Sequence, residues 1–318
     1  MRESAFVKAN ISKWEEFESL IGTKAKKDPD ELADLFVQLT DDLSYAKTHY
    51  PQSEITVYLN NLSTKVHQYI YRNRKERRNR FVEFWKLELP KIFWVHRKEF
   101  LYSLIFFLAA CLIGAFSAAN DDAFVRLILG DEYVNMTLSN IERGVPLGVY
   151  GKMAQADMFV FITFNNVRVS FIAFAMGVVA SIGTVFMLFQ NGVMLGSFQY
   201  FFYSKGLLVT SLLTIWIHGT IEIISIVVAG GAGLIMGNSM LFPGTYTRME
   251  SLRRGALTGA KVVLGLVPMF ILAGFLESYV TRLFDMPDFL KAIIIFGSLA
   301  FMIYYIILYP RKLYKDVL

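Results

Sequence analysis

The sequence predicts an all-α, polytopic helical membrane protein with an N-terminal soluble helical bundle and a broken, re-entrant helical hairpin. The chain of 318 residues is 54% hydrophobic and only 19% charged, which is too apolar for a soluble domain of this length. It also contains uncharged runs close to the roughly 20 residues with which a helix spans about 30 Å of hydrocarbon. These runs are 100–119, 169–204, 223–247, 262–276 and 292–309.

Residues 1–80 form the predicted cytoplasmic helical domain. Apolar residues recur every three to four positions in three stretches, and each stretch therefore predicts an amphipathic helix. The three stripes are Phe6, Trp14, Phe17 and Ile21; Leu32, Leu35, Phe36, Leu39 and Leu43; and Ile55, Leu59, Leu62, Val66, Tyr69 and Ile70. Asp28 as a cap and Pro29 at the first helical position mark the expected start of the second helix.

A basic run connects this domain to the membrane segments. Its basic residues are Arg72, Arg74, Lys75, Arg77, Arg78 and Arg80. Anionic lipid headgroups would attract such a run by about 1 kcal/mol per basic residue, so we expect it to face lipid or to form a solvated helix, with no nucleic acid as partner. Residues 81–98 mix aromatic and charged side chains, which is typical of an interfacial helix. The transmembrane domain is then 99–318.

The charges between the apolar runs predict the orientation, because loops rich in lysine and arginine remain cytoplasmic. Acidic residues outnumber basic ones in 120–168 and in 277–291, whereas basic residues dominate 238–261 and the C-terminal tail. We therefore expect an external segment at about 120–166 and both termini in the cytoplasm.

Residues 190–237 must leave and re-enter the cytoplasmic side if 169–189 is an inward crossing. Two full crossings would place Lys205 near the middle of one of them, at a cost of about 2.5–3.5 kcal/mol. The favoured alternative is an interfacial helix over 192–204, followed by a short hairpin that turns at His218–Gly219 and returns over 220–237.

His218 and Glu222 are the candidate functional residues of this stretch, because they lie four residues apart and share one helix face. An ionisable pair in a membrane segment should point into the helix bundle. Three roles are open: a structural pair that holds the hairpin turn, a proton or ion relay, or a contact to a partner subunit. Glu277 could join them in a metal site, but the spacing does not require one, and no cofactor is expected.

Glycines predict close helix packing, either within one chain or between subunits of a homo-oligomer. The small-xxx-small pairs are Gly192/Gly196, Gly233/Gly237 and Gly255/Gly259, and Gly230 and Gly231 lie in the AGGAG run.

Several motifs occur together in a fixed order. They are Asn165–Asn166, NGxxxG at Asn191–Gly196, HGxxE at His218–Glu222 with the following AGGAGLIMG, Pro243–Gly244, and Glu277 in AGFLES. In this combination the chain resembles the stage II sporulation protein M family of bacterial multi-pass membrane proteins, over roughly residues 81–285.

The resemblance implies a non-enzymatic scaffold of the bacterial cytoplasmic (inner) membrane. The sporulation member of the family works beside septal peptidoglycan hydrolases. Relatives with an N-terminal extension, as here, are typically encoded near RDD-family membrane proteins and MoxR-type ATPases. The resemblance thus implies these two as possible partners.

Catalytic residues are not apparent in the sequence. It contains no Walker loop, no Ser-His-Asp order with suitable spacing and, with Cys111 as its single cysteine, no Cys-based metal site. The alternative function is a transporter or channel-like protein that uses the His218/Glu222 hairpin, since transporters build their sites from broken helices.

Overall fold

The computed structural model describes residues 1–22, 29–72, 80–148, 154–283 and 285–316. Most of these residues are helical, with no strand among them, and the chain divides into two units, Met1–Arg80 and Phe81–Leu318.

The N-terminal unit contains the three helices expected from the apolar stripes. They are α1 (Glu3–Gly22), α2 (Pro29–His49) and α3 (Glu54–Arg72). Their shared core is formed by Phe6, Trp14, Phe17, Leu39, Leu43, Ala46, Leu59 and Leu62. The Trp14 indole is buried, and its Nε1 donates a hydrogen bond to Asp42 Oδ2 (2.8 Å), which ties α1 to α2. Asp28 and residues 73–79 of the basic run lie outside the described residues, whereas Arg80 is exposed.

The second unit begins with short helical pieces and continues into long apolar helices. The pieces are α4 (Arg80–Glu83), a π-turn (Phe84–Glu88) and α5 (Leu89–Val95). The long helices are α6 (Arg97–Asn120), α9 (Gln155–Ala175), α10 (Ile182–Ser204), α11 (Leu208–Leu241), α12 (Arg248–Phe275) and α13 (Asp288–Ile303), and α14 (Tyr309–Tyr314) ends the chain. The amphipathic helices α7 (Asp122–Leu129) and α8 (Asp131–Glu142) lie between α6 and α9.

Five helices of the described part of the chain are long and apolar enough to cross a membrane: α6, α11, and α9, α12 and α13 with the helical turns that continue these last three. Helix α10 is a sixth candidate, because it is 23 residues long and carries no charged side chain. Polar side chains such as Gln190 and Asn191 lower its hydropathy. The predicted class of helical membrane protein is confirmed.

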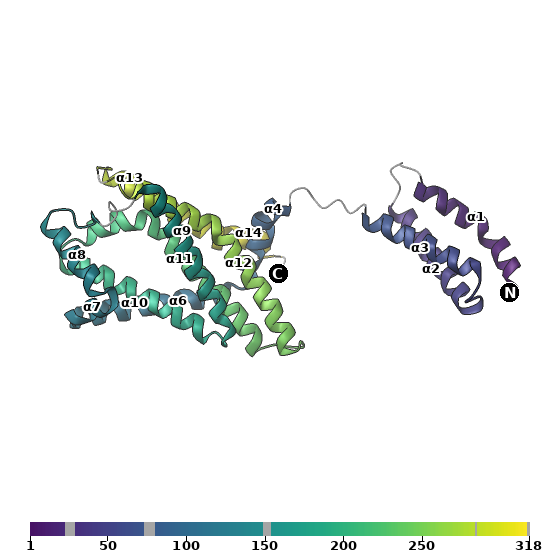
Figure 1. The fold of residues 1–318 in the computed structure, drawn as a ribbon, viewed down its shortest axis with the longest axis horizontal. Helices are drawn as coiled ribbons and strands as arrows, with labels where there is room; N and C mark the ends of the chain where they lie inside the picture. The colour runs from purple at the N-terminus through teal and green to yellow at the C-terminus, as the bar shows by residue number, and fades with distance from the viewer. Residues whose placement is uncertain (23–28, 73–79, 149–153, 284, 317–318) are drawn as a thin grey trace. The chain divides into compact units, whose positions relative to one another are not determined.

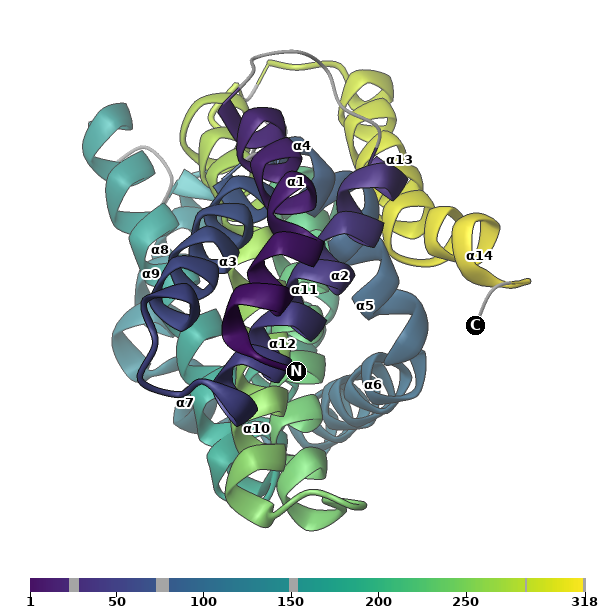
Figure 2. The same cartoon turned by 90° about the vertical axis from the view of Figure 1, so that its right-hand side faces the viewer.

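Helix α11 lies at the centre of the membrane unit (Figures 1 and 2). It is buried almost continuously from Ile215 to Gly237 and contacts α6, α9, α10, α12 and α13. The glycines of the predicted pairs lie at these contacts. A Cβ atom at any of Gly192, Gly196, Gly230, Gly231, Gly233, Gly237, Gly255 or Gly259 would overlap a neighbouring segment of the same chain. These glycines therefore pack helices within one chain.

The prediction of a broken hairpin is wrong. Helix α11 continues without interruption through His218 and Gly219, and the chain reverses instead at 205–207, where Gly206 has φ +72°. A continuous helix satisfies its own backbone hydrogen bonds inside the membrane, so the apolar segment gains nothing by breaking there.

The turn before α10 explains the error. The uncharged run 169–204 contains the end of α9, a turn at 179–181 and all of α10. Lys205 consequently caps the end of α10 and does not lie in the middle of a crossing. Helix α9 begins at Gln155, so the last part of the segment 120–166, which the charge pattern predicts to be external, is helical and belongs to α9.

Candidate functional site

Helices α11 and α12 bring together the polar residues that the sequence singled out inside the membrane unit. His218 and Glu222 lie one turn apart on α11. Glu277 comes from the π-turn Leu276–Val280 that ends α12, and Thr281 follows directly after it. One potential ligand atom from each of His218, Glu222 and Glu277 lies within 4.8 Å of the other two. We call these three residues the acidic-histidine cluster.

Hydrogen bonds fix the orientation of the His218 ring. Its Nδ1 lies 3.0 Å from Thr281 Oγ1, and the Thr281 hydroxyl donates to the Leu276 carbonyl oxygen (3.1 Å). Because the hydroxyl proton is used in that bond, Thr281 Oγ1 accepts from His218 Nδ1–H. The Nε2 atom is then the unprotonated one in the neutral ring, and it lies 3.8 Å from Glu277 Oε1.

Helix α9 closes the cluster from a third side. Asn166 is only 5% exposed, and its side chain lies against the Glu222 carboxyl group. The Asn166 side-chain amide faces this carboxyl group outside the geometry of an ordinary hydrogen bond. Asn166 therefore supports the Glu222 side chain from α9.

The cluster is shielded from solvent. The side chains of His218 and Glu277 are only 5% and 14% exposed. The arrangement links α11 to the end of α12 through His218–Thr281, so a structural role no longer depends on a hairpin turn. The same atoms could exchange protons or hold a cation. A direct contact between His218 and another subunit would require these helices to separate.

The remaining family-motif residues lie elsewhere. Asn165 is on the exposed side of α9, whereas the neighbouring Asn166 is buried. Asn191 donates its Nδ2 to Met187 O in its own helix α10 (2.8 Å) and does not reach the cluster. Sequence reasoning missed Thr281, because the π-turn changes which residues of this segment face α11.

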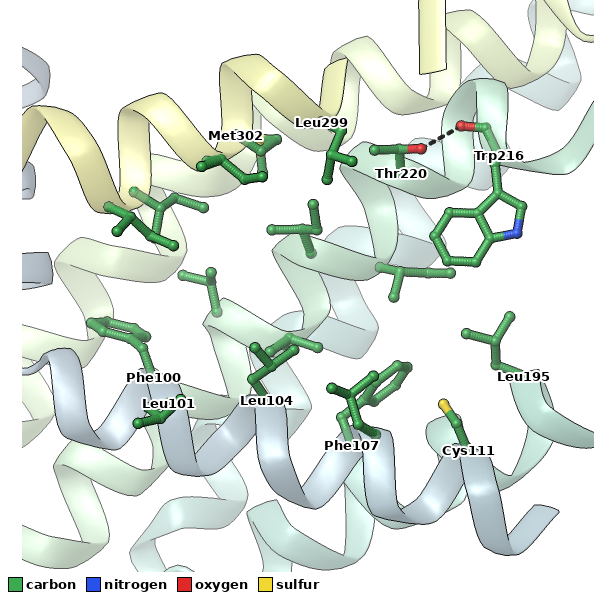
Figure 3. A pocket seen from close by; sticks show the side chains of 18 of the residues that line it. Phe100, Leu101, Leu104, Phe107, Cys111, Leu195, Trp216, Thr220, Leu299 and Met302 are labelled. Carbon is green, nitrogen blue, oxygen red and sulfur yellow. Dashed lines mark hydrogen bonds between the residues drawn. The ribbon is translucent and has the colours of Figure 1, made fainter. Parts of the chain in front are cut away.

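A large apolar pocket lies on the opposite face of α11. It has a volume of about 1070 Å³ and lies between α6, α10, α11 and α13 (Figure 3). Leu299 and Met302 of α13 face Phe100, Leu104 and Phe107 of α6 across it. Its lining is almost entirely apolar and does not include the acidic-histidine cluster, so it suits hydrocarbon and not a polar substrate.

Comparison with known proteins adds two family matches. Residues 103–282, more than half of the chain, match the family described as Stage II sporulation protein M. Residues 4–72 match a Domain of unknown function (DUF8413). No curated protein and no solved structure matches the chain. The resemblance drawn from the motifs is confirmed, although the match begins at 103 and thus leaves out residues 81–102.

Proposed function

Since the chain belongs to the stage II sporulation protein M family, we propose that it is a non-enzymatic membrane scaffold that organises partner proteins at the bacterial cytoplasmic membrane. The observation that carries the proposal is a polar patch on the outer face of α9, which consists of Asn165 and Arg168. Both side chains are exposed within a helix that is long and apolar enough to cross the membrane.

The depth of Arg168 makes exposure to lipid unfavourable. At about 1.5 Å per residue, Arg168 lies about 20 Å from Gln155 and about 15 Å from Val178, the two ends of this span. An arginine near the centre of a membrane helix costs about 2.5–3.5 kcal/mol on insertion scales and usually faces protein or water. A partner helix over Asn165 and Arg168 would remove that cost, and a second copy of the chain is our first candidate.

Cysteine cross-linking tests the assembly. In a Cys111→Ala background, we expect Phe164→Cys, which replaces an exposed residue beside Asn165 on α9, to form a disulfide-linked dimer in native membranes. Phe296→Cys on α13, at a residue with similar exposure (67% against 70%), serves as the control and should remain monomeric. Equal cross-linking at both positions, or none at Phe164→Cys with a monomeric native mass, would remove this support for a homo-oligomer.

Other partners follow only from the family. An RDD-family membrane protein and a MoxR-type ATPase are the proposed members of the same system. The bilayer is a further partner, through the apolar faces of the long helices and the basic run before 81.

The topology of the scaffold follows from counting α10 as a crossing. With α10, the described part of the chain has six candidate membrane helices, an even number that leaves both termini on one side. Arg248, Arg253 and Arg254 in the first turns of α12 indicate that this side is cytoplasmic, as do the basic residues of the C-terminal tail.

Reporter fusions check this topology. We expect alkaline phosphatase to be inactive when fused after Glu250 and active when fused after Gly206, because the first position is cytoplasmic and the second external. The reverse pattern would show that the protein is inserted with the opposite orientation. Activity at neither position would exclude an external loop between α10 and α11.

Transport is the second candidate function, and the acidic-histidine cluster favours it. Ionisable residues inside a membrane bundle often mark ion pathways or proton relays. The continuous α11 removes the broken helix on which this candidate first depended. Proton or cation uptake by liposomes that contain the purified protein would support transport over a scaffold.

A further inference from the structure

We propose that His218, Glu222 and Glu277 bind one divalent transition-metal ion inside the membrane unit, with Thr281 and Asn166 as the residues that position these ligands. The proposal goes beyond the scaffold function, which requires no metal. It combines one nitrogen and two carboxylate ligands from two different helix segments.

The distances between the ligand atoms are close to those of a metal site. Bonds of about 2.0–2.2 Å from a tetrahedral metal ion to nitrogen and oxygen place two ligand atoms about 3.4 Å apart. His218 Nε2 and Glu277 Oε1 are 3.8 Å apart, and the three ligand atoms lie within 4.8 Å of one another. Small rotations of the two glutamate side chains would bring all three atoms to bonding distance.

The His218 ring already has the tautomer and the support that metal binding needs. Its Nδ1–H is donated to Thr281, so the lone pair of Nε2 points toward the carboxylates. Metal-binding histidines usually donate their second ring N–H in this way, which fixes the ring and strengthens the ligand.

Charge balance also favours a cation. Two carboxylates close together inside a membrane repel each other and lose hydration, and a neutral histidine compensates for neither. One divalent ion would neutralise both carboxylates.

Asn166 supports one of the three ligands. It is more than nine-tenths buried, and its side-chain amide faces the Glu222 carboxyl group outside the geometry of an ordinary hydrogen bond. When Glu222 turns toward a metal ion with one oxygen, its second oxygen can accept from this amide. Outer-shell donors commonly hold ligating carboxylates in this way.

The ligand types select the class of metal. Imidazole nitrogen favours zinc, cobalt, iron and similar ions, whereas magnesium and calcium prefer sites made only of oxygen. We therefore expect Zn²⁺ and Co²⁺ to bind and Mg²⁺ to compete poorly.

Metal titration of the full chain, purified in mild detergent without a histidine tag and stripped with chelator, tests the site. We expect one Zn²⁺ per chain by elemental analysis, and visible absorption on adding Co²⁺ that excess Zn²⁺ abolishes. Glu222→Gln, Glu277→Gln and His218→Asn should each weaken binding more than 10-fold, since loss of an outer-shell partner alone costs about 10–100-fold. Glu250→Gln on the α12 surface should bind as the wild type does.

Thr281 provides a finer control. Thr281→Val keeps the shape of the side chain but removes the acceptor for His218 Nδ1–H, so affinity should fall about 10–100-fold, and Thr281→Ser should restore it. Elution volume and unfolding temperature in chelator establish that each variant is folded. If a ligand variant does not fold, the Zn²⁺ stoichiometry and the Co²⁺ spectrum of the wild type determine whether the protein binds the metal ion. A folded wild type that binds less than one-tenth of an equivalent of Zn²⁺, or folded ligand variants that keep wild-type affinity, would overturn the proposal.

Discussion

Replacing Gly196 with leucine is expected to prevent the membrane unit from reaching its native packing. Gly196 lies where α10 crosses α6, and even a single Cβ atom there would overlap the Cys111 carbonyl oxygen. Since the obstacle is backbone, no side-chain rotation can relieve the contact, and the helices must move apart. Overpacking usually costs about 1–3 kcal/mol, and we expect a backbone collision to lie at or above the upper end.

Gly297→Leu is the matched control on α13. No atom lies within 4 Å of the position where a Cβ atom would be, so the leucine meets open space within the chain. The same glycine-to-leucine change should therefore leave the yield and the unfolding temperature unchanged or slightly higher, because leucine favours helix by up to about 1 kcal/mol over glycine. Yield from membranes and a single symmetric elution peak are the measurements. A Gly196→Leu protein as stable as Gly297→Leu would show that α6 and α10 do not pack as closely as the structure places them.

The sequence contains the information for the long helices but little for the turns between them. Uncharged runs locate α6, α11, α12 and α13, because exclusion of charge is a direct requirement of the hydrocarbon. The turn at 179–181 leaves no such mark. Ala180 and Ser181 have positive φ angles (47° and 67°) although neither is glycine. The sequence therefore has no residue that favours this backbone conformation at the point where the chain reverses direction. Because this turn is not recognisable in the sequence, the pattern predicts the wrong position for the next membrane crossing and, as a result, a hairpin that the structure does not contain.

The candidate site was only partly visible in the sequence for a related reason. His218 and Glu222 are four residues apart, so helix geometry alone places them on one face. Glu277 and Asn166 reach them only through the packing of α12 and α9 on α11, which no periodicity encodes. The glycine pairs indicated close packing, yet the sequence could not distinguish contacts within a chain from contacts between chains.

Glu222 variants are expected to separate the structural role of the cluster from a proton relay. Measured in chelator, so that no metal contributes, thermal stability and yield of assembled protein should rank wild type above Glu222→Gln above Glu222→Ala. Glutamine keeps the shape of the side chain and an acceptor oxygen beside Asn166. Alanine removes both and leaves buried polar neighbours unsatisfied, which costs about 1–3 kcal/mol.

A proton relay predicts instead that both Glu222 variants lose activity equally. An amide cannot take up and release a proton, so Glu222→Gln would then abolish function as completely as Glu222→Ala while stability stayed nearly normal. Complementation of a deletion strain measures the function of each variant, and its unfolding temperature measures the stability. If complementation declines in parallel with stability, the cluster acts by holding α9, α11 and the end of α12 together. A stable, fully assembled Glu222→Gln protein that complements nothing would refute the structural role and favour ion or proton coupling through the membrane unit.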